Sequence, residues 1–145
     1  GEVKAKGRQL MFIGNGGSAA LAEHQMSHYL QRGVRCAVPS TSSLLTQMAN
    51  DFSYAESFSE SLRAMMGDGD ILVAISGLGK SANIQKAVEL VKPMGCKVVT
   101  LTGFNALNRL KRLGDLNFYV PSHSYGIIET CHDLILHGVF ELSGV

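Results

Sequence analysis

Short apolar runs alternate along the chain with segments whose apolar residues recur at helical spacing. The clearest run covers residues 70–76. It is bounded by glycines and apolar almost throughout, which is typical of a strand buried on both faces. Most runs stop at a glycine or a proline. The pattern predicts strands at residues 9–13, 35–38, 70–76, 97–102 and 116–120, and helices at 18–31, 52–66, 81–91, 107–113 and 125–142.

Five alternations of strand and helix predict an α/β fold. We expect βαβ units that build an open, five-stranded parallel sheet with helices on both faces. Sheets of this kind present their ligand-binding loops at the carboxyl ends of the strands. The length of 145 residues, without repeat or linker, favours a single domain over residues 1–145.

Composition removes several classes of function. A formal net charge of +1 argues against a protein that binds nucleic acid mainly by electrostatics. No apolar run approaches the roughly 20 residues that span a bilayer, so no membrane partner is expected. The chain starts without an apolar signal segment, and its three cysteines have no metal-type spacing. We therefore expect buried, reduced thiols in a cytoplasmic protein, at Cys36, Cys96 and Cys131.

Glycine is enriched, with 16 residues in 145, about 11% against a usual ~7%. Several of these glycines follow predicted strands, in GNGGS (14–18), SGLGKS (76–81) and TLTG (100–103). Glycine lets a ligand approach the backbone closely, and the helix that follows directs N–H groups and a positive dipole end at it. The loops therefore predict a site for a phosphate or a phosphorylated metabolite. The alternative is that the glycines only form tight turns.

Neither of the first two loops fits a nucleotide motif. Loop 76–81 ends in Gly-Lys-Ser as a P-loop does, but one residue separates its glycines where a P-loop has four. In loop 14–18, Ala19 stands where the dinucleotide fingerprint needs its last glycine, and no acidic residue ends the second predicted strand. The sequence therefore predicts no nucleotide cofactor.

Titratable residues gather on two of the predicted helices. His24 and His28 are four residues apart and share one face of the first helix. His132, on the last helix, is expected to be structural or exposed at the surface. Such groups could supply acid–base catalysis or hold a metal ion, or they could be ordinary polar residues on helix faces. Three more residues of the last helix recur every fourth position and line one stripe: Glu129, Asp133 and His137.

Several stretches together resemble the sugar isomerase (SIS) domain, and within it the phosphoheptose isomerase branch. The family has a doubly wound, flavodoxin-like parallel sheet that binds sugar phosphates at its strand ends. Members of the branch convert sedoheptulose 7-phosphate to glycero-manno-heptose 7-phosphate and form tetramers, so the resemblance implies a sugar-phosphate substrate and a homo-oligomer. The stretches are GNGGSAALAEH (14–24), MANDFSYAESFS (48–59), GDGDILVAISGLGKSANIQKAVE (67–89), VVTLTG (98–103) and VPSHSYGIIETCHDLILH (120–137).

Loop chemistry and this resemblance together predict the site residues. Asp51 matches a polar residue that reaches the sugar, and His137 matches a histidine thought to act as a general acid and base. His24 and Glu129 match zinc-binding positions, with Glu129 in place of the usual Gln. The other substrate-binding residues are expected in the glycine-bearing loops: Asn15, Gly16, Gly17, Ser18, Ser76, Gly77, Ser81 and Thr102.

The most consequential departure from the family is His28, which stands where the branch has a catalytic Glu. Imidazole ordinarily titrates near neutral pH and can serve as a base, so we predict His137 and His28 as the catalytic pair. The same change also fits a non-catalytic relative, such as a phosphosugar sensor or a scaffold like those that bind the replication initiator. A metal site, with zinc as the expected ion, is predicted at His24, His28, Glu129 and His137.

Other departures concern the loops and the length. Gly77 and Leu78 replace Thr-Ser, Lys80 replaces Asn, and Gly126-Ile127 replaces Asp-Arg before the last helix. The chain opens almost directly on its first strand, without the family's N-terminal helices, and is several residues short near Gly33. A hexose phosphate also stays open as the substrate, because the shape of the pocket determines which sugar binds.

Overall fold

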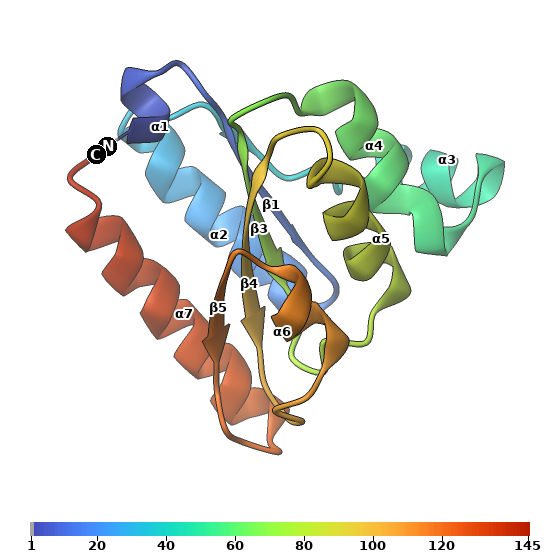
Figure 1. Ribbon diagram of the computed structural model, residues 1–145, viewed down its shortest axis with the longest axis vertical. Helices are drawn as coiled ribbons and strands as arrows, with labels where there is room; N and C mark the ends of the chain where they lie inside the picture. Colours follow the sequence, from blue (N-terminus) through green and yellow to red (C-terminus); the bar gives the residue numbers. More distant parts are fainter. Residues whose placement is uncertain (1) are drawn as a thin grey trace.

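The computed structural model describes residues 2–145 as an α/β sandwich in which one sheet lies between two layers of helices (Figure 1). The elements follow one another as α1 (Glu2–Ala5), β1 (Leu10–Gly14), α2 (Gly17–Gln31), β2 (Cys36–Ala37), α3 (Ser42–Asp51), the 3₁₀ turn η1 (Tyr54–Glu56), α4 (Ser57–Met65), β3 (Ile71–Ile75), α5 (Ala82–Val91), β4 (Lys97–Thr102), α6 (Arg109–Leu113), β5 (Leu116–Tyr119) and α7 (Tyr125–Leu142).

All five strands are parallel, in the order β2-β1-β3-β4-β5. This is the flavodoxin-like order, so the predicted fold class is confirmed. The order reverses between β1 and β3, where Gly14 pairs with Ile75 at the carboxyl ends. Loops that leave two such strands diverge to opposite faces of the sheet and open a crevice for a ligand.

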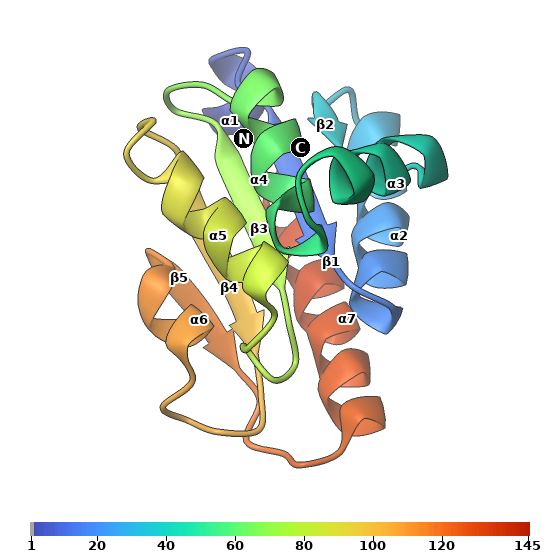
Figure 2. The same ribbon diagram turned by 90° about the vertical axis from the view of Figure 1, so that its right-hand side faces the viewer.

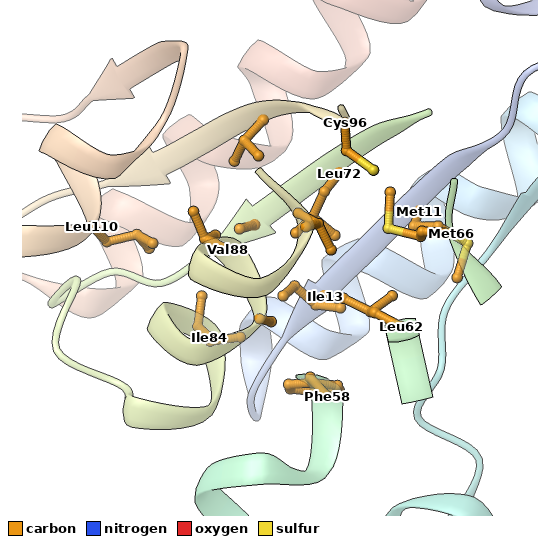
Figure 3. Packing of buried hydrophobic residues seen from close by; sticks show 14 residues of the cluster. Met11, Ile13, Phe58, Leu62, Met66, Leu72, Ile84, Val88, Cys96 and Leu110 are labelled. Carbon is orange, nitrogen blue, oxygen red and sulfur yellow. The ribbon is translucent and has the colours of Figure 1, made fainter. Parts of the chain in front are cut away.

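The strands are apolar on both faces because helices cover both. In β1, Met11 and Ile13 face one core while Leu10 and Phe12 face the other. The first core packs the sheet against α4, α5 and α6, and its buried side chains point toward one another from the sheet and the helices (Figure 3). The second packs it against α2 and α7. This double burial is the reason that continuous apolar runs, without alternation, predict these strands correctly.

Helices α2 and α7 lie side by side on one face of the sheet, with α4 and α5 on the other (Figures 1 and 2). The carboxyl ends of the strands and the start of α7 lie together at the lower end of both views. Among the described residues, no helix has the length and apolar character needed to cross a membrane.

The sequence prediction fails most clearly in the segment between β2 and β3. Residues 42–51 form α3, where no element is expected, and the predicted helix 52–66 begins only at Ser57. Phe52 is the C-cap that follows α3, and Ser53 is extended, with φ −168° and ψ 161°. The helix does carry a short apolar stripe at helical spacing, Leu44, Leu45 and Met48, which is only half-buried, and the expectation of no element here is wrong. Phe52 and Tyr54 are exposed, which made the predicted stripe of 52–66 too long.

Smaller differences concern ends and cysteines. Strand β2 is only two residues long, and α2 starts at Gly17, so Ser18, where the helix was expected to begin, lies inside its first turn. All three cysteines are free, as expected, but only Cys96 is fully buried. Burial raises the pKa of the half-buried Cys36 thiol to about 11, which keeps it protonated.

Candidate functional site

A hollow of about 310 Å³ opens at the point where the strand order reverses. It lies between the loop after β1 and the loop after β3, and the first turn of α7 closes its third side. Seven of the predicted substrate-binding residues line it, together with Ile75, Leu78, Tyr125 and Glu129. They are Asn15, Gly16, Gly17, Ser18, Ser76, Gly77 and Ser81.

Two glycines in the first loop are required by geometry. Gly16 has a φ of +55°, which side chains rarely tolerate. At Gly14, a Cβ would lie 2.5 Å from the carbonyl oxygen of Ser18, so only glycine lets the strand turn directly into α2. The loop is thereby tight enough to place Ser18, which is almost fully buried, at the base of the hollow.

The second loop contributes hydroxyls. Ser76 Oγ and Ser81 Oγ are 3.3 Å apart, one from the end of β3 and the other from the residue before α5. Together with Ser18 they provide neutral donors in a hollow that carries no lysine or arginine in its lining. An anion here would therefore be bound by hydroxyls and backbone amides, as the loop chemistry predicts.

Asn15 is held by residues that the sequence did not reveal. Its amide exchanges two hydrogen bonds of 2.9 Å with the amide of Asn83 on α5, and its Oδ1 accepts a third, also 2.9 Å, from the Tyr54 hydroxyl. These bonds tie the loop after β1 to the opposite helix layer. No sequence motif points to Asn83 or Tyr54, because their partner is at least 39 residues away.

Two predicted residues lie elsewhere. Asp51 ends α3, is exposed and accepts a hydrogen bond from Asn50. Thr102 is fully buried, and its hydroxyl accepts a 3.2 Å bond from Asn117. The structure does not bring either of them into the lining of the hollow.

His132 is structural, which was one of the two expectations for it. It is fully buried, and its Nε2 donates to the carbonyl of Thr102 at 3.1 Å. Desolvation lowers its pKa below the usual 6.5, although this hydrogen bond acts in the opposite direction. His132 therefore fastens α7 to the end of β4 as a neutral imidazole.

The structure brings three of the predicted residues together in what we call the histidine cluster: His24, His28 and His137. Ligand nitrogens of the three rings all lie within 4.8 Å of one another. Nε2 of His24 is 3.2 Å from Nε2 of His28, and the His137 ring packs against both at centroid distances of 5.3 and 5.0 Å. The cluster therefore joins residues more than 100 positions apart through the packing of α2 on α7.

Glu129 is not part of this cluster. It lies against Gly17, where a Cβ would come within 2.5 Å of its Oε1. Helices α2 and α7 thus start together, with Gly17 beside Glu129, and meet again further along, with His28 beside His137. Gly17 and His24 are seven residues apart, so they share one face of α2 about 10 Å apart. The hollow and the histidine cluster consequently lie along the same pair of helices.

Comparisons with known proteins identify the family to which the chain belongs. The family profile of the SIS domain matches residues 2–103. The phosphoheptose isomerase of Colwellia psychrerythraea is 35% identical over 145 residues, which cover 94% of this chain and 74% of that protein. The phosphoheptose isomerase of Coxiella burnetii is 38% identical over 138 residues, 89% of this chain and 69% of that protein. The chain belongs to the SIS domain family.

Among solved structures, two phosphoheptose isomerases have folds that closely match the fold of this chain. The phosphoheptose isomerase of Neisseria gonorrhoeae superposes with a TM-score of 0.89 at 29% identity, over 96% of this chain and 77% of that one. That of Francisella tularensis gives a TM-score of 0.90 at 26% identity, over 97% and 78%. Within the family, this chain is thus similar to phosphoheptose isomerases in both sequence and structure, as its motifs predict.

Proposed function

We propose that the protein is a sugar-phosphate isomerase that interconverts an aldose and a ketose, with sedoheptulose 7-phosphate as its substrate. The observation that carries the proposal is the pairing of a hydroxyl-lined hollow with a cluster of imidazoles along α2 and α7. Similarity to phosphoheptose isomerases supports the choice of substrate. A phosphorylated sugar has an anion at one end and a carbonyl at the other, and the hollow and the histidine cluster suit these two ends.

The phosphate end is assigned to the hollow. Ser18, Ser76 and Ser81 would donate to phosphate oxygens, and Gly16 would let the anion approach the start of α2, while the Glu129 carboxylate fills the space beside Gly17. Hydrogen bonds to a charged group contribute about 1.5–3 kcal/mol each, so three hydroxyls can offset the absence of a basic side chain in the lining. Asp51 and Thr102 stay predictions for substrate contact, since neither belongs to this lining.

The carbonyl end is assigned to the histidine cluster. Isomerisation needs a base that removes a proton from the carbon beside the carbonyl and an acid that protonates the carbonyl oxygen. The base then returns its proton to the former carbonyl carbon, and the hydroxyl on the first carbon gives its proton back to the acid as the new carbonyl forms. His28 and His137 come from different helices, with ring centroids 5.0 Å apart, so both can reach adjacent carbons of one substrate. We assign the two proton transfers to this pair.

The same imidazoles also fit a zinc ion, as an alternative to direct proton transfer by His28 and His137, because an imidazole nitrogen that binds zinc cannot also take up a proton. Zn²⁺ binds histidine nitrogen at about 2.0–2.1 Å, so two ligand nitrogens of a tetrahedral site lie about 3.3 Å apart. His24 Nε2 and His28 Nε2 are 3.2 Å apart, a separation that two lone pairs do not adopt without a proton or a cation between them. When bound, a zinc ion would polarise the substrate carbonyl. His24, His28 and His137 would hold it. Glu129 remains only a prediction as the fourth ligand, because its carboxylate lies against Gly17 and is not grouped with the three imidazoles.

Turnover of sedoheptulose 7-phosphate by the purified protein, with and without added Zn²⁺, tests the proposal. His137→Ala should lose activity while it keeps substrate affinity within a few-fold. His123→Ala is the matched control, since this histidine lies in the loop before α7, against Phe104, and should leave activity unchanged. Tight binding without turnover in either condition would contradict the enzymatic assignment and favour a phosphosugar-binding protein.

Homo-oligomeric assembly and a cytoplasmic location belong to the same proposal. Apolar side chains on α7 favour assembly, because Ile127, Leu134 and Leu142 are 56%, 72% and 90% exposed. Sedimentation velocity over a range of concentrations measures the oligomeric state directly. A monomer at every concentration would contradict the assembly.

A further inference from the structure

Asp133 is the member of the α7 stripe to which the sequence assigns no role. Its Oδ1 lies 3.5 Å from Nε2 of His137, one helical turn further along. We propose that Asp133 is the carboxylate of the histidine cluster, a positioning residue that orients His137 for metal binding. The inference rests on the metal-binding part of the proposed function. It concerns a residue outside the four predicted ligands.

The structure leaves the cluster without a carboxylate of its own. The three grouped residues are all imidazoles, and Glu129 has its carboxylate against Gly17. Asp133 is the acidic residue in contact with a cluster histidine among the interactions of residues 2–145. Both partners of this contact are a little over one third exposed, at 38% for Asp133 and 37% for His137.

A buried amide holds Asp133 from the other helix. Gln25 lies between His24 and His28 along α2, and its side chain is fully buried. Its Nε2 donates a hydrogen bond to Asp133 Oδ1 at 3.5 Å. Its Oε1 has no partner among the described residues. Burying an amide costs free energy unless hydrogen bonds compensate for it, so the bond to Asp133 is what fixes this side chain. The carboxylate thereby connects α2 to His137.

Metal-binding histidines commonly rely on a carboxylate in this way. A histidine that ligates a metal through one ring nitrogen usually donates the other N–H to a carboxylate, which fixes its tautomer and orientation. The carboxylate is in turn hydrogen-bonded, as Asp133 is by Gln25. Two i,i+4 pairs on two neighbouring helices therefore complete the cluster: His24 with His28 on α2, and Asp133 with His137 on α7.

Zinc affinity of the metal-free protein, measured by competition with a chromophoric chelator, tests the role. Asp133→Asn keeps the shape and removes the charge, and it should weaken Zn²⁺ binding by about 10–100-fold. Gln25→Met should weaken it in the same direction. Glu141→Gln is the matched control, since Glu141 is exposed, carries the same charge and lies one turn beyond His137 on α7. It should bind Zn²⁺ as the unaltered protein does.

Cobalt spectra separate orientation from direct ligation. With Co²⁺ as the probe, the visible bands of Asp133→Asn should keep the position and intensity seen in the unaltered protein, because the nitrogen ligands are retained. Thermal unfolding of each metal-free variant checks that the fold is intact. The proposal is overturned if the unaltered protein binds no Zn²⁺, if Asp133→Asn binds it within twofold, if Glu141→Gln weakens it equally, or if the cobalt bands change. Turnover is measured separately, so a protein that binds zinc but lacks activity contradicts the proposed function and leaves this inference standing.

Discussion

Gly103 marks the place where β4 meets the first turn of α7, and alanine there should destabilise the protein. A Cβ at this position would lie 2.6, 2.8 and 3.1 Å from Cδ1, Cγ1 and Cγ2 of Ile128. Ile128 is fully buried, so it cannot swing into solvent. The backbone of Gly103 does not lie in the left-handed region, and the whole penalty is therefore steric.

The expected magnitude follows from the behaviour of overpacked cores. An extra methyl group in a well-packed site costs about 1–3 kcal/mol, because neighbours leave their preferred rotamers or the backbone shifts. Ile128→Ala alone leaves a cavity and should cost about 2–5 kcal/mol. In the double variant, the new methyl enters the space that Ile128 vacates. The double variant should therefore be more stable than the sum of the two losses predicts, by about 1 kcal/mol or more.

Urea unfolding of the four proteins, followed by circular dichroism, provides this double-mutant cycle. Independent sites add to within about 0.3–0.5 kcal/mol, so a coupling above this limit is readily detected. Additive losses would refute the reasoning, since they would mean that Gly103 and Ile128 do not compete for the same space. Glu129 follows Ile128 directly, so the same displacement would also move the lining of the hollow.

Three further predictions concern other contacts. Burial lowers the pKa of His132, so the unfolded chain binds more protons in acid, and the free energy of unfolding should fall as the pH drops below about 6.5. Replacing His132 by Gln should flatten that acid limb by up to about 1.4 kcal/mol per pH unit in pH-dependent urea titrations, and an unchanged limb would contradict the assignment. Asn83→Ala leaves the amide of Asn15 without its reciprocal partner and should cost about 1–3 kcal/mol in the same assay, whereas no loss would show that water replaces the bonds. Ser81→Ala should raise KM for the sugar phosphate about tenfold with little change in kcat, whereas Ser42→Ala, exposed at the start of α3, should change neither, and equal effects would argue against a phosphate contact at Ser81.

The parts of the structure that the sequence predicted well are those with a local signal. Buried strands such as β3 form continuous apolar runs. The glycines that a sharp turn requires lie at the end of β1, where Gly14 is the last residue of the strand and Gly16 follows in the loop. The hollow could be predicted because each loop is a contiguous piece of chain and parallel strands end at one edge of the sheet. Helix α3 was missed although Leu44, Leu45 and Met48 recur at helical spacing, because a stripe this short, with no fully buried residue, is a weak signal.

The site residues divide in the same way. Gly17 and Ser18 line the hollow as expected, because their place follows from β1 alone. Thr102 likewise ends β4, but its hydroxyl accepts a hydrogen bond from the Asn117 side chain on β5, and its carbonyl accepts one from the His132 ring. Whether a polar residue at a strand end faces a ligand or a neighbour depends on what packs against it, and residue type does not determine that.

By itself, the sequence determined the fold class, the glycine-bearing loops and the two i,i+4 patterns on α2 and α7, because strand and helix periodicities are properties of the backbone. The tertiary structure decided which of these patterns meet. In the folded protein, His137 packs beside His28 and the Glu129 carboxylate lies against Gly17. Asp133 accepts a hydrogen bond from the buried Gln25. These outcomes depend on the relative position of two helices more than 90 residues apart, and only the packing of both on one sheet fixes that position.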